Sequence, residues 1–190
     1  MSFTNLGLSP ALLKSVANQK WEEAYPIQQK AIPAILNKKD VLGIAETGSG
    51  KTASYVLPIL MNLQRAQTAK NRLIQALVLV PTRELAMQIN EVFQTFIPAL
   101  SKTKKTMAVY GGVSINPQMK ALYGVDILIA TPGRLLDLVD SNAVQLTEVT
   151  TLILDEADKM LNLGFKDEMN RIFSLLPAKP ILDPFVYFLV

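Results

Sequence analysis

The chain has 190 residues, of which 49% are apolar, and its formal net charge is +3. It contains neither Cys nor His, which excludes zinc fingers, disulfide frameworks, cysteine nucleophiles and serine–histidine triads. Carboxylates, Lys, Arg, hydroxyl groups and a bound metal remain as sources of chemistry, in a composition typical of one packed domain.

Targeting and membrane signals are weak in this sequence. The first ten residues lack the basic start and the apolar block of a signal peptide. The apolar runs are too short to cross a bilayer, so we expect a soluble, cytoplasmic protein with no membrane partner. The mildly basic charge permits nucleic acid binding without arguing for it. We interpret the basic stretch at residues 101–106, SKTKKT, as a solvated loop.

Short β-branched and aliphatic runs alternate with segments that have helical spacing. In chain order, we expect a helix beginning at Ser9-Pro10, a strand at 40–45, a helix at 51–63, a strand at 76–80, a helix at 82–96, strands at 106–111 and 126–130, a helix at 134–139, a strand at 151–155 and a helix at 166–176. This alternation predicts an α/β fold with a mostly parallel sheet and helices on both faces.

A polar or glycine-rich cluster follows each of the five predicted strands directly. The clusters read AETGSGKT, PTREL, GG, TPGR and DEAD. Ligands of open α/β sheets bind beyond the carboxyl ends of the strands. We therefore expect these distant segments to meet at one end of one sheet.

The first cluster, residues 45–52, predicts a phosphate-binding loop. Its glycines allow successive N–H groups to face inward, Lys51 adds a positive charge, and Thr52 offers a hydroxyl to a metal ion. The strict pattern has Gly where Ala45 stands. The alternative is a glycine-rich turn with an exposed lysine. The predicted nucleotide-binding residues of the loop are Thr47, Gly48, Ser49, Gly50, Lys51 and Thr52.

The fifth cluster, DEAD at residues 155–158, allows two interpretations. Aspartate favours helix starts, so the cluster could be only a helix cap. Beside a phosphate loop, however, Asp155 could hold Mg²⁺ together with Thr52, and Glu156 could orient or deprotonate an attacking water. We favour the interpretation as a catalytic site, with Lys51, Asp155 and Glu156 as catalytic residues. Asp158 would then cap the helix that follows.

Taken in this order, the five clusters resemble the N-terminal RecA-like domain of DEAD-box ATP-dependent RNA helicases, over roughly residues 2–177. The resemblance implies a RecA-like P-loop fold that uses ATP and Mg²⁺ and contacts RNA without reading its sequence. It also implies that Asp158 couples the motifs of the two helicase domains.

The resemblance further implies an adenine-reading motif upstream of the phosphate loop. Gln28 would bond the adenine edge, Trp21 would provide an aromatic surface, and Phe3 would be the isolated upstream aromatic residue. An amide donates and accepts at once, which matches N6 and N7 of adenine. Ala24-Tyr25 replaces the Pro-Thr that the family usually has, and the alternative for Gln28 is an amide on the protein surface.

An RNA-binding surface is implied at the ends of the second, third and fourth strands. Glycines allow close approach of the backbone, Arg pairs with phosphates, and contacts with 2′-OH groups favour RNA over DNA. The residues are Pro81, Thr82, Arg83, Gly111, Gly112, Thr131, Pro132, Gly133 and Arg134.

The family pattern ends before the C-terminus. We assign residues 1–177 to the ATP-binding domain and residues 178–190, AKPILDPFVYFLV, to an atypical tail that keeps strand-like character at FVYFLV. No Ser-Ala-Thr motif occurs, and we expect the second RecA-like domain to be absent, which predicts weak nucleotide binding and no unwinding by this chain alone. The alternatives are a catalytically dead module that acts by occupying nucleotide or RNA, and a P-loop ATPase that acts on DNA or protein.

Overall fold

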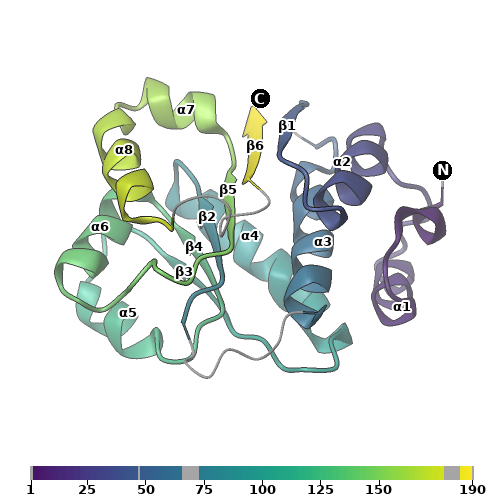
Figure 1. Cartoon of the computed structure of the whole chain (residues 1–190), viewed down its shortest axis with the longest axis horizontal. Helices are drawn as coiled ribbons and strands as arrows, with labels where there is room; N and C mark the ends of the chain where they lie inside the picture. Colours follow the sequence, from purple (N-terminus) through teal and green to yellow (C-terminus); the bar gives the residue numbers. More distant parts are fainter. Residues whose placement is uncertain (1, 47, 66–72, 178–184, 190) are drawn as a thin grey trace.

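The computed structural model describes residues 2–46, 48–65, 73–177 and 185–189. Its centre is one parallel sheet in the order β1-β6-β5-β2-β4-β3, in which every neighbouring pair is parallel (Figure 1). The strands are Val41–Ile44 (β1), Ala76–Leu79 (β2), Thr106–Val109 (β3), Ile127–Ala130 (β4), Thr151–Leu154 (β5) and Phe185–Leu189 (β6). The predicted α/β fold with a parallel sheet is confirmed.

Helices cover both faces of this sheet (Figure 1). The α-helices are Pro10–Asn18 (α1), Pro26–Leu36 (α2), Lys51–Arg65 (α3), Arg83–Phe96 (α4), Ile115–Ala121 (α5), Pro132–Asp140 (α6), Ala157–Asn162 (α7) and Lys166–Leu175 (α8), with 3₁₀ turns at Phe3–Leu6 (η1) and Ile97–Ala99 (η2). Alternate strand residues enter opposite cores. Val78 and Ile129 pack with α1 to α4, whereas Leu79 and Leu128 pack with α5 to α8.

Strand β6 determines the spacing of the two segments expected to carry chemistry. It lies between β1, which precedes the phosphate loop, and β5, which precedes the DEAD cluster. Adjacent strands are 4.7–4.9 Å apart, so the carboxyl ends of β1 and β5 lie roughly 10 Å apart. The strand-like stretch of the tail therefore does form a strand, in the middle of the site-bearing half of the sheet.

Helix starts follow the sequence prediction at two places and depart from it at a third. The Ser9 and Thr82 hydroxyls accept the N–H groups of Leu12 and Leu85, each at 3.3 Å, and so cap α1 and α4. The prediction that Asp158 caps α7 is wrong. The N-cap is Glu156, with left-handed φ 54° and ψ 48°, because the chain turns directly out of β5 and leaves Asp158 in the first helical turn.

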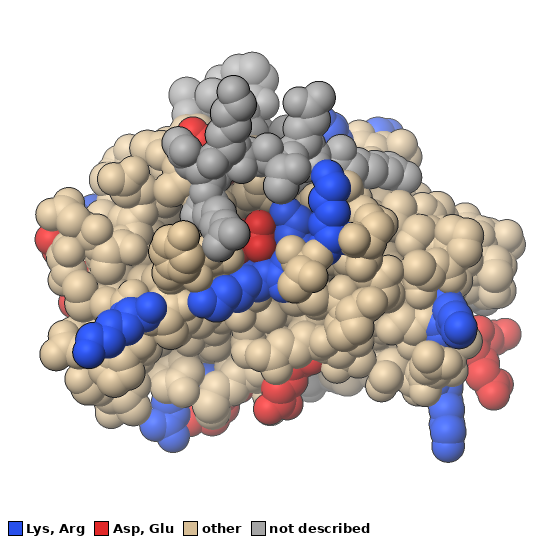
Figure 2. Space-filling model, turned by 90° about the horizontal axis from the view of Figure 1, so that it is seen from below, with Lys and Arg blue, Asp and Glu red and all other residues tan. Residues whose placement is uncertain are grey.

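The basic stretch at residues 101–106 is not a uniformly solvated loop. Lys104 is buried, and its Nζ lies 3.1 Å from Oδ1 of Asp126. Lys105 donates to the carbonyls of Ala121 and Tyr123. Figure 2, which views the side where the strands begin, shows Lys and Arg as a broken row among mostly uncharged residues. Within the described part of the chain, no helix combines the length and apolar character needed to span a bilayer.

Candidate functional site

A cavity of about 580 Å³ opens where α2, α3, α4 and β5 meet at the carboxyl end of the sheet. It brings together most of the predicted nucleotide-site residues: Phe3, Trp21, Gln28, Gly48, Gly50, Lys51, Thr52, Asp155 and Glu156. Ser49 is not among its lining residues, and the Ser49 hydroxyl donates to the Glu46 carbonyl at 2.6 Å. Thr47 lies outside the described residues. Segments more than 100 residues apart thus line one cavity.

Lys51 is the first residue of α3, and its side chain is buried, with 8% exposure. Its Nζ has no hydrogen-bond partner among the described residues. A buried ammonium group without a partner is costly, and the start of a helix adds further positive potential at the same place. The cavity therefore presents a positive charge for which the described residues supply no hydrogen-bonding acceptor.

The backbone of the phosphate loop depends on two left-handed glycines. Gly48 and Gly50 have φ values of +80° and +83°. A Cβ at Gly50 would lie 2.4 Å from Nε2 of Gln28, whereas a Cβ at Gly48 would meet nothing within 4 Å among the described atoms. At Gly50, both the backbone conformation and the close approach of Gln28 require glycine.

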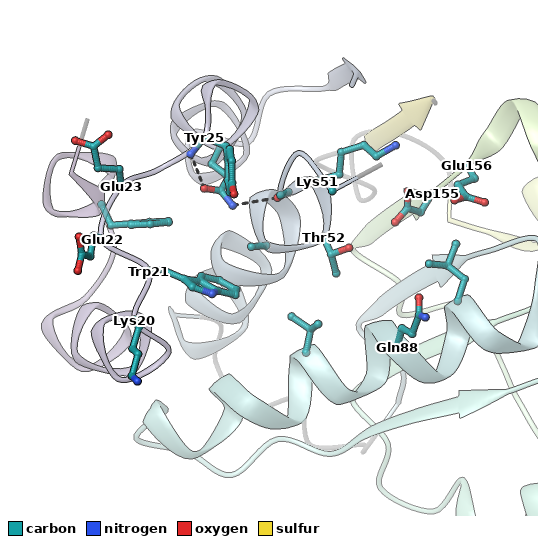
Figure 3. Close-up of a pocket in the computed structure, with 17 residues that line it drawn as sticks. Lys20, Trp21, Glu22, Glu23, Tyr25, Lys51, Thr52, Gln88, Asp155 and Glu156 are labelled. Carbon is teal, nitrogen blue, oxygen red and sulfur yellow. Dashed lines mark hydrogen bonds between the residues drawn. The ribbon is translucent and has the colours of Figure 1, made fainter. Parts of the chain in front are cut away.

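Gln28 is buried, with 2% exposure, so it is not a surface amide. Its Oε1 accepts the Tyr25 N–H at 2.9 Å, and its Nε2 donates to the Gly50 carbonyl at 3.1 Å (Figure 3). The side chain thereby ties the first turn of α2 to the phosphate loop. Its contact with adenine stays a prediction.

Aromatic side chains form the opposite end of the cavity from Lys51. The Trp21 ring stacks on Phe3 with a centroid distance of 6.4 Å and meets Phe96 at 5.4 Å. Figure 3 shows Trp21 on the side of the cavity away from Asp155 and Glu156. The site thus has an apolar, aromatic end and a charged end, which suits a ligand with a planar base and an anionic tail.

Asp155 follows β5 directly and is 3% exposed. Burial raises its pKa above the ordinary value, while a hydrogen bond from Tyr55 and the charge of Lys51 act in the opposite direction. The Tyr55 hydroxyl donates to Oδ2 of Asp155 at 2.8 Å. Sequence reasoning missed Tyr55, although its position one helical turn after Lys51 placed it on the same face of α3.

Glu156 has a left-handed backbone, which is strained for a residue with a side chain. Its Oε2 lies 3.2 Å from Nζ of Lys159 without hydrogen-bond geometry, and the carboxylate is mostly buried. Figure 3 shows Asp155 and Glu156 side by side, with Thr52 next to Asp155 and Gln88 of α4 below the pair. Gln88 is a second lining residue that sequence reasoning missed.

The donors of this cavity suit Mg²⁺. No group of three or more Asp, Glu, His or Cys side chains gathers as a metal cage in the described parts of the chain. Magnesium usually keeps several waters and binds through one or two carboxylates together with phosphate oxygens. Thr52 and Asp155 offer hard oxygen atoms in the same cavity as the unpartnered Lys51 ammonium, so the residues fit a metal that arrives with a phosphate ligand.

The segments after β2 and β3 form a separate region of the same sheet end. Arg83 is half exposed, with its guanidinium 5.8 Å from the centre of the Tyr110 ring and 3.3 Å from Glu84. Pro81 is buried, and Thr82 uses its hydroxyl as the cap of α4. Gly111 and Gly112 are exposed, and an added Cβ at either would meet nothing within 4 Å among the described atoms.

Two buried side chains bind the chain at either end of the segment that we call the glycine loop, residues 111–113. Gln118 accepts the N–H of Tyr110 at 3.1 Å and donates to its carbonyl at 3.2 Å. Arg134, 7% exposed, donates through Nη2 to the Val113 carbonyl at 2.7 Å, and its Nε lies 3.5 Å from Asp137. The structure thus gives Arg134 a partner within the protein, and its predicted contact with RNA stays a prediction.

The remaining predicted residues lie where β4 passes into α6. Thr131 is half-buried, and its N–H donates to the Val109 carbonyl at 3.2 Å. Pro132 is the buried first residue of α6, and Gly133 follows it with open space around its Cβ position among the described atoms. These residues bring the start of α6 beside the end of β3.

Comparisons with known proteins agree with this geometry. Residues 25–185 match the family model described as DEAD/DEAH box helicase. The chain is 47% identical over 178 residues to the DEAD-box ATP-dependent RNA helicase CshA of Streptococcus pneumoniae, covering 93% of this chain and 33% of that protein. It is 43% identical over 179 residues to RhpA of Helicobacter pylori, covering 94% of this chain and 35% of that protein.

Structural similarity leads to the same family. A crystal structure of a DEAD box protein from the hyperthermophile Methanococcus jannaschii superposes with a TM-score of 0.85 at 36% identity, covering 100% of this chain and 50% of that one. The chain spans about a third of the length of the curated relatives it matches. With its parallel sheet, phosphate loop and DEAD cluster, the chain belongs to the DEAD/DEAH box helicase family as one RecA-like domain.

Proposed function

We propose that this chain binds ATP with Mg²⁺ and is the ATP-binding domain of an RNA helicase, in which ATP hydrolysis drives separation of RNA duplexes. The observation that carries the proposal is the buried Lys51 ammonium, which has no hydrogen-bond partner among the described residues and lines the same cavity as Asp155. A triphosphate supplies the acceptors that Lys51 lacks.

Each side chain of the cavity has a role in this proposal. Lys51 and the start of α3 bind the phosphates, and Gly48 and Gly50 allow the backbone to approach them. Thr52 and Asp155 would hold Mg²⁺, partly through water. When bound, the ion neutralises charge that develops on the transferred phosphoryl group. Glu156 orients or deprotonates the attacking water.

The aromatic end of the cavity would take the base. Trp21, with Phe3 behind it, supports the adenine, and Gln28 approaches its edge while holding the phosphate loop. Asp158 would couple the motifs to a partner domain. We assign residues 1–177 to this ATP-binding domain, and the tail at 178–190 replaces the family's Ser-Ala-Thr region.

RNA is the second proposed ligand. Exposed Arg83, the open glycine loop and the start of α6 lie where phosphate contacts through guanidinium and backbone N–H groups are available. Contacts of this kind are independent of base sequence and weaken with salt. RNA and DNA oligomers of one sequence, titrated at two salt concentrations, test this part, and equal affinity for both would contradict a preference for RNA.

A thermal shift experiment tests nucleotide binding. At an ADP concentration 100 times the Kd, with Mg²⁺ present, linkage stabilises the folded state by about 2.7 kcal/mol. In a domain of this size that corresponds to a rise in Tm of roughly 5–10 °C. Lys51→Ala should remove the shift, whereas Lys14→Ala, at an exposed position of α1, should keep it. A wild-type protein with no shift would refute the proposal.

A steady-state ATPase assay with RNA tests the need for a partner domain. Arginines supplied across a domain cleft raise phosphoryl-transfer rates by about 10³–10⁵ in other enzymes. We therefore expect weak nucleotide binding and little turnover from the 190-residue chain by itself. Robust RNA-stimulated turnover would contradict this expectation.

A further inference from the structure

We propose that Tyr55 is a positioning residue for the magnesium ligands, in which one buried phenol links the Thr52 hydroxyl to the Asp155 carboxylate. The inference rests on the proposed function and deepens it. It assigns a role to a residue outside the five sequence clusters, in the second turn of α3.

The geometry around Tyr55 is unusual for a core aromatic residue. Its side chain is completely buried, yet its hydroxyl reaches across 100 residues of sequence to Oδ2 of Asp155 at 2.8 Å. The Thr52 side chain contributes a hydrogen-bonding interaction to the same phenol. The two residues predicted to hold the metal thus share one neighbour.

The direction of these hydrogen bonds suits a metal site. A phenol has one O–H to donate, and Tyr55 gives it to Asp155, so its oxygen is left to accept. The Thr52 hydroxyl, one turn before Tyr55 on α3, can donate to that oxygen. Thr52 then keeps its lone pairs for a cation.

The same contacts restrict the Asp155 carboxylate. A carboxylate at the end of a strand can rotate about its terminal torsion, which is broad and roughly two-fold. The hydrogen bond from Tyr55 engages Oδ2, so rotation would break it. Groups that orient a metal ligand in this way typically change metal affinity by 10–100-fold when they are removed.

The simpler alternative is that Tyr55 only fills the core and that its hydroxyl needs an acceptor there. That role predicts a loss of stability on removing the hydroxyl and no change in the magnesium requirement. The two roles therefore differ in a quantity that can be measured on the whole chain.

The test is a magnesium titration of Tyr55→Phe, which keeps the ring and removes the hydroxyl. Binding of a fluorescent ADP analogue to the 190-residue chain is followed as Mg²⁺ is added. We expect the magnesium concentration for half-maximal enhancement of binding to rise roughly tenfold. Affinity for the analogue in EDTA should stay within about twofold, because the phosphate-binding groups are unchanged. A magnesium midpoint equal to that of the wild type overturns the inference.

Ser54→Ala is the matched control. Ser54 is fully buried next to Tyr55 on α3, and its hydroxyl donates to the Lys51 carbonyl at 2.5 Å. The Ser54→Ala substitution should lower Tm and leave the magnesium concentration for half-maximal enhancement of binding unchanged. If Ser54→Ala raises the midpoint as much as Tyr55→Phe does, the effect is general loosening of α3 and the inference fails. A wild-type chain that binds ADP without any magnesium dependence would instead refute the proposed function.

A measurement on the unsubstituted protein covers the case in which Tyr55→Phe does not fold. The chain has five tyrosines, so 3-fluorotyrosine labelling gives five fluorine resonances, and substituting the other four assigns Tyr55 by elimination. Adding Mg²⁺ to the ADP complex should shift the Tyr55 resonance. A resonance that does not respond to the metal overturns the inference.

Discussion

The phosphate loop and the glycine loop lie at the same end of one sheet, and each has a buried cation beside it, but only the cation beside the glycine loop donates a hydrogen bond among the described residues. Beside the phosphate loop, Lys51 Nζ is buried without a hydrogen-bond partner among the described residues. Beside the glycine loop, buried Arg134 donates through Nη2 to the Val113 carbonyl at 2.7 Å and faces Asp137, whereas its Nε and Nη1 have no hydrogen-bond partner among the described residues. The first arrangement leaves a charge for a ligand, whereas the second uses a charge to hold the chain.

Lys51 and Arg134 occupy similar positions in the sequence, but the first is available to a ligand and the second holds a loop. Both cations follow a glycine and lie in the first turn of a helix that comes after a strand. An unpartnered buried charge makes the empty site costly and the bound site favourable, so ligand binding is coupled to stability. A partnered charge adds stability without any ligand.

The largest effect is expected from comparing one glycine of each loop. Gly50→Ala and Gly112→Ala both place a side chain at a positive φ, +83° and +78°, which costs about 1–2 kcal/mol. Only at Gly50 does the new Cβ meet Nε2 of Gln28, at 2.4 Å. Overpacking of this kind adds typically about 1–3 kcal/mol.

Denaturant unfolding measures both variants. The double variant Gly50→Ala/Gln28→Ala should lose less free energy of unfolding than the sum of the two single changes, because the contact with Gln28 is then absent and only the contact with Cδ2 of Tyr25, at 2.9 Å, remains. If Gly50→Ala and Gly112→Ala lower the free energy of unfolding equally, the close approach of Gln28 does not contribute to the cost of Gly50→Ala.

The comparison is tested most directly by replacing each cation with methionine. Arg134→Met removes a charged donor from the Val113 carbonyl and should lower the free energy of unfolding by roughly 1.5–3 kcal/mol. Lys51→Met should not lower the free energy of unfolding, because an unpartnered buried ammonium group is costly and the substitution removes it. The comparison breaks down if the two losses, measured without nucleotide, are the same.

The smallest effect concerns the pH dependence of stability. Burial raises the pKa of Asp155 in the folded state above its unfolded value. Between these two pKa values the native state binds more protons than the unfolded state. The free energy of unfolding therefore falls as pH rises through that window. Asp155→Asn keeps an acceptor for Tyr55 and removes the charge. In EDTA it should be more stable than the wild type at neutral pH, and the difference should vanish toward acid pH.

Melting curves from acid to neutral pH check this expectation. Glu46→Gln, which removes an exposed carboxylate near the phosphate loop, is the control and should show no such gain. A neutral-pH Tm of Asp155→Asn below that of the wild type would mean that the Asp155 charge is favourable in the free protein.

Sequence patterns predicted local features well because local forces produce them. The β-branched runs became strands within one or two residues of the expected bounds, and the Ser9 cap formed as predicted. Hydrogen bonds between neighbours in the chain decide such features, so neighbouring residues are enough to predict them.

Features that depend on contacts across the chain were not predicted. The sequence predicted that Lys104 lies in a solvated loop, but the fold places it beside Asp126, which directly precedes β4. Gln28 could have been a surface amide, and only the packing of α2 against the phosphate loop buries it. The cap of α7 moved from Asp158 to Glu156 because the turn out of β5 fixes the backbone there.

The sequence by itself determined the alternation of strands and helices, the phosphate loop with its lysine, and the acidic cluster after the fifth strand. Only the tertiary structure decided that Lys51 is buried without a hydrogen-bonding partner among the described residues, that Arg134 has one, and that Tyr55 bonds Asp155. The physical reason is range: periodicity and capping act over a few residues, whereas burial and pairing of charge depend on which distant segments the sheet brings together.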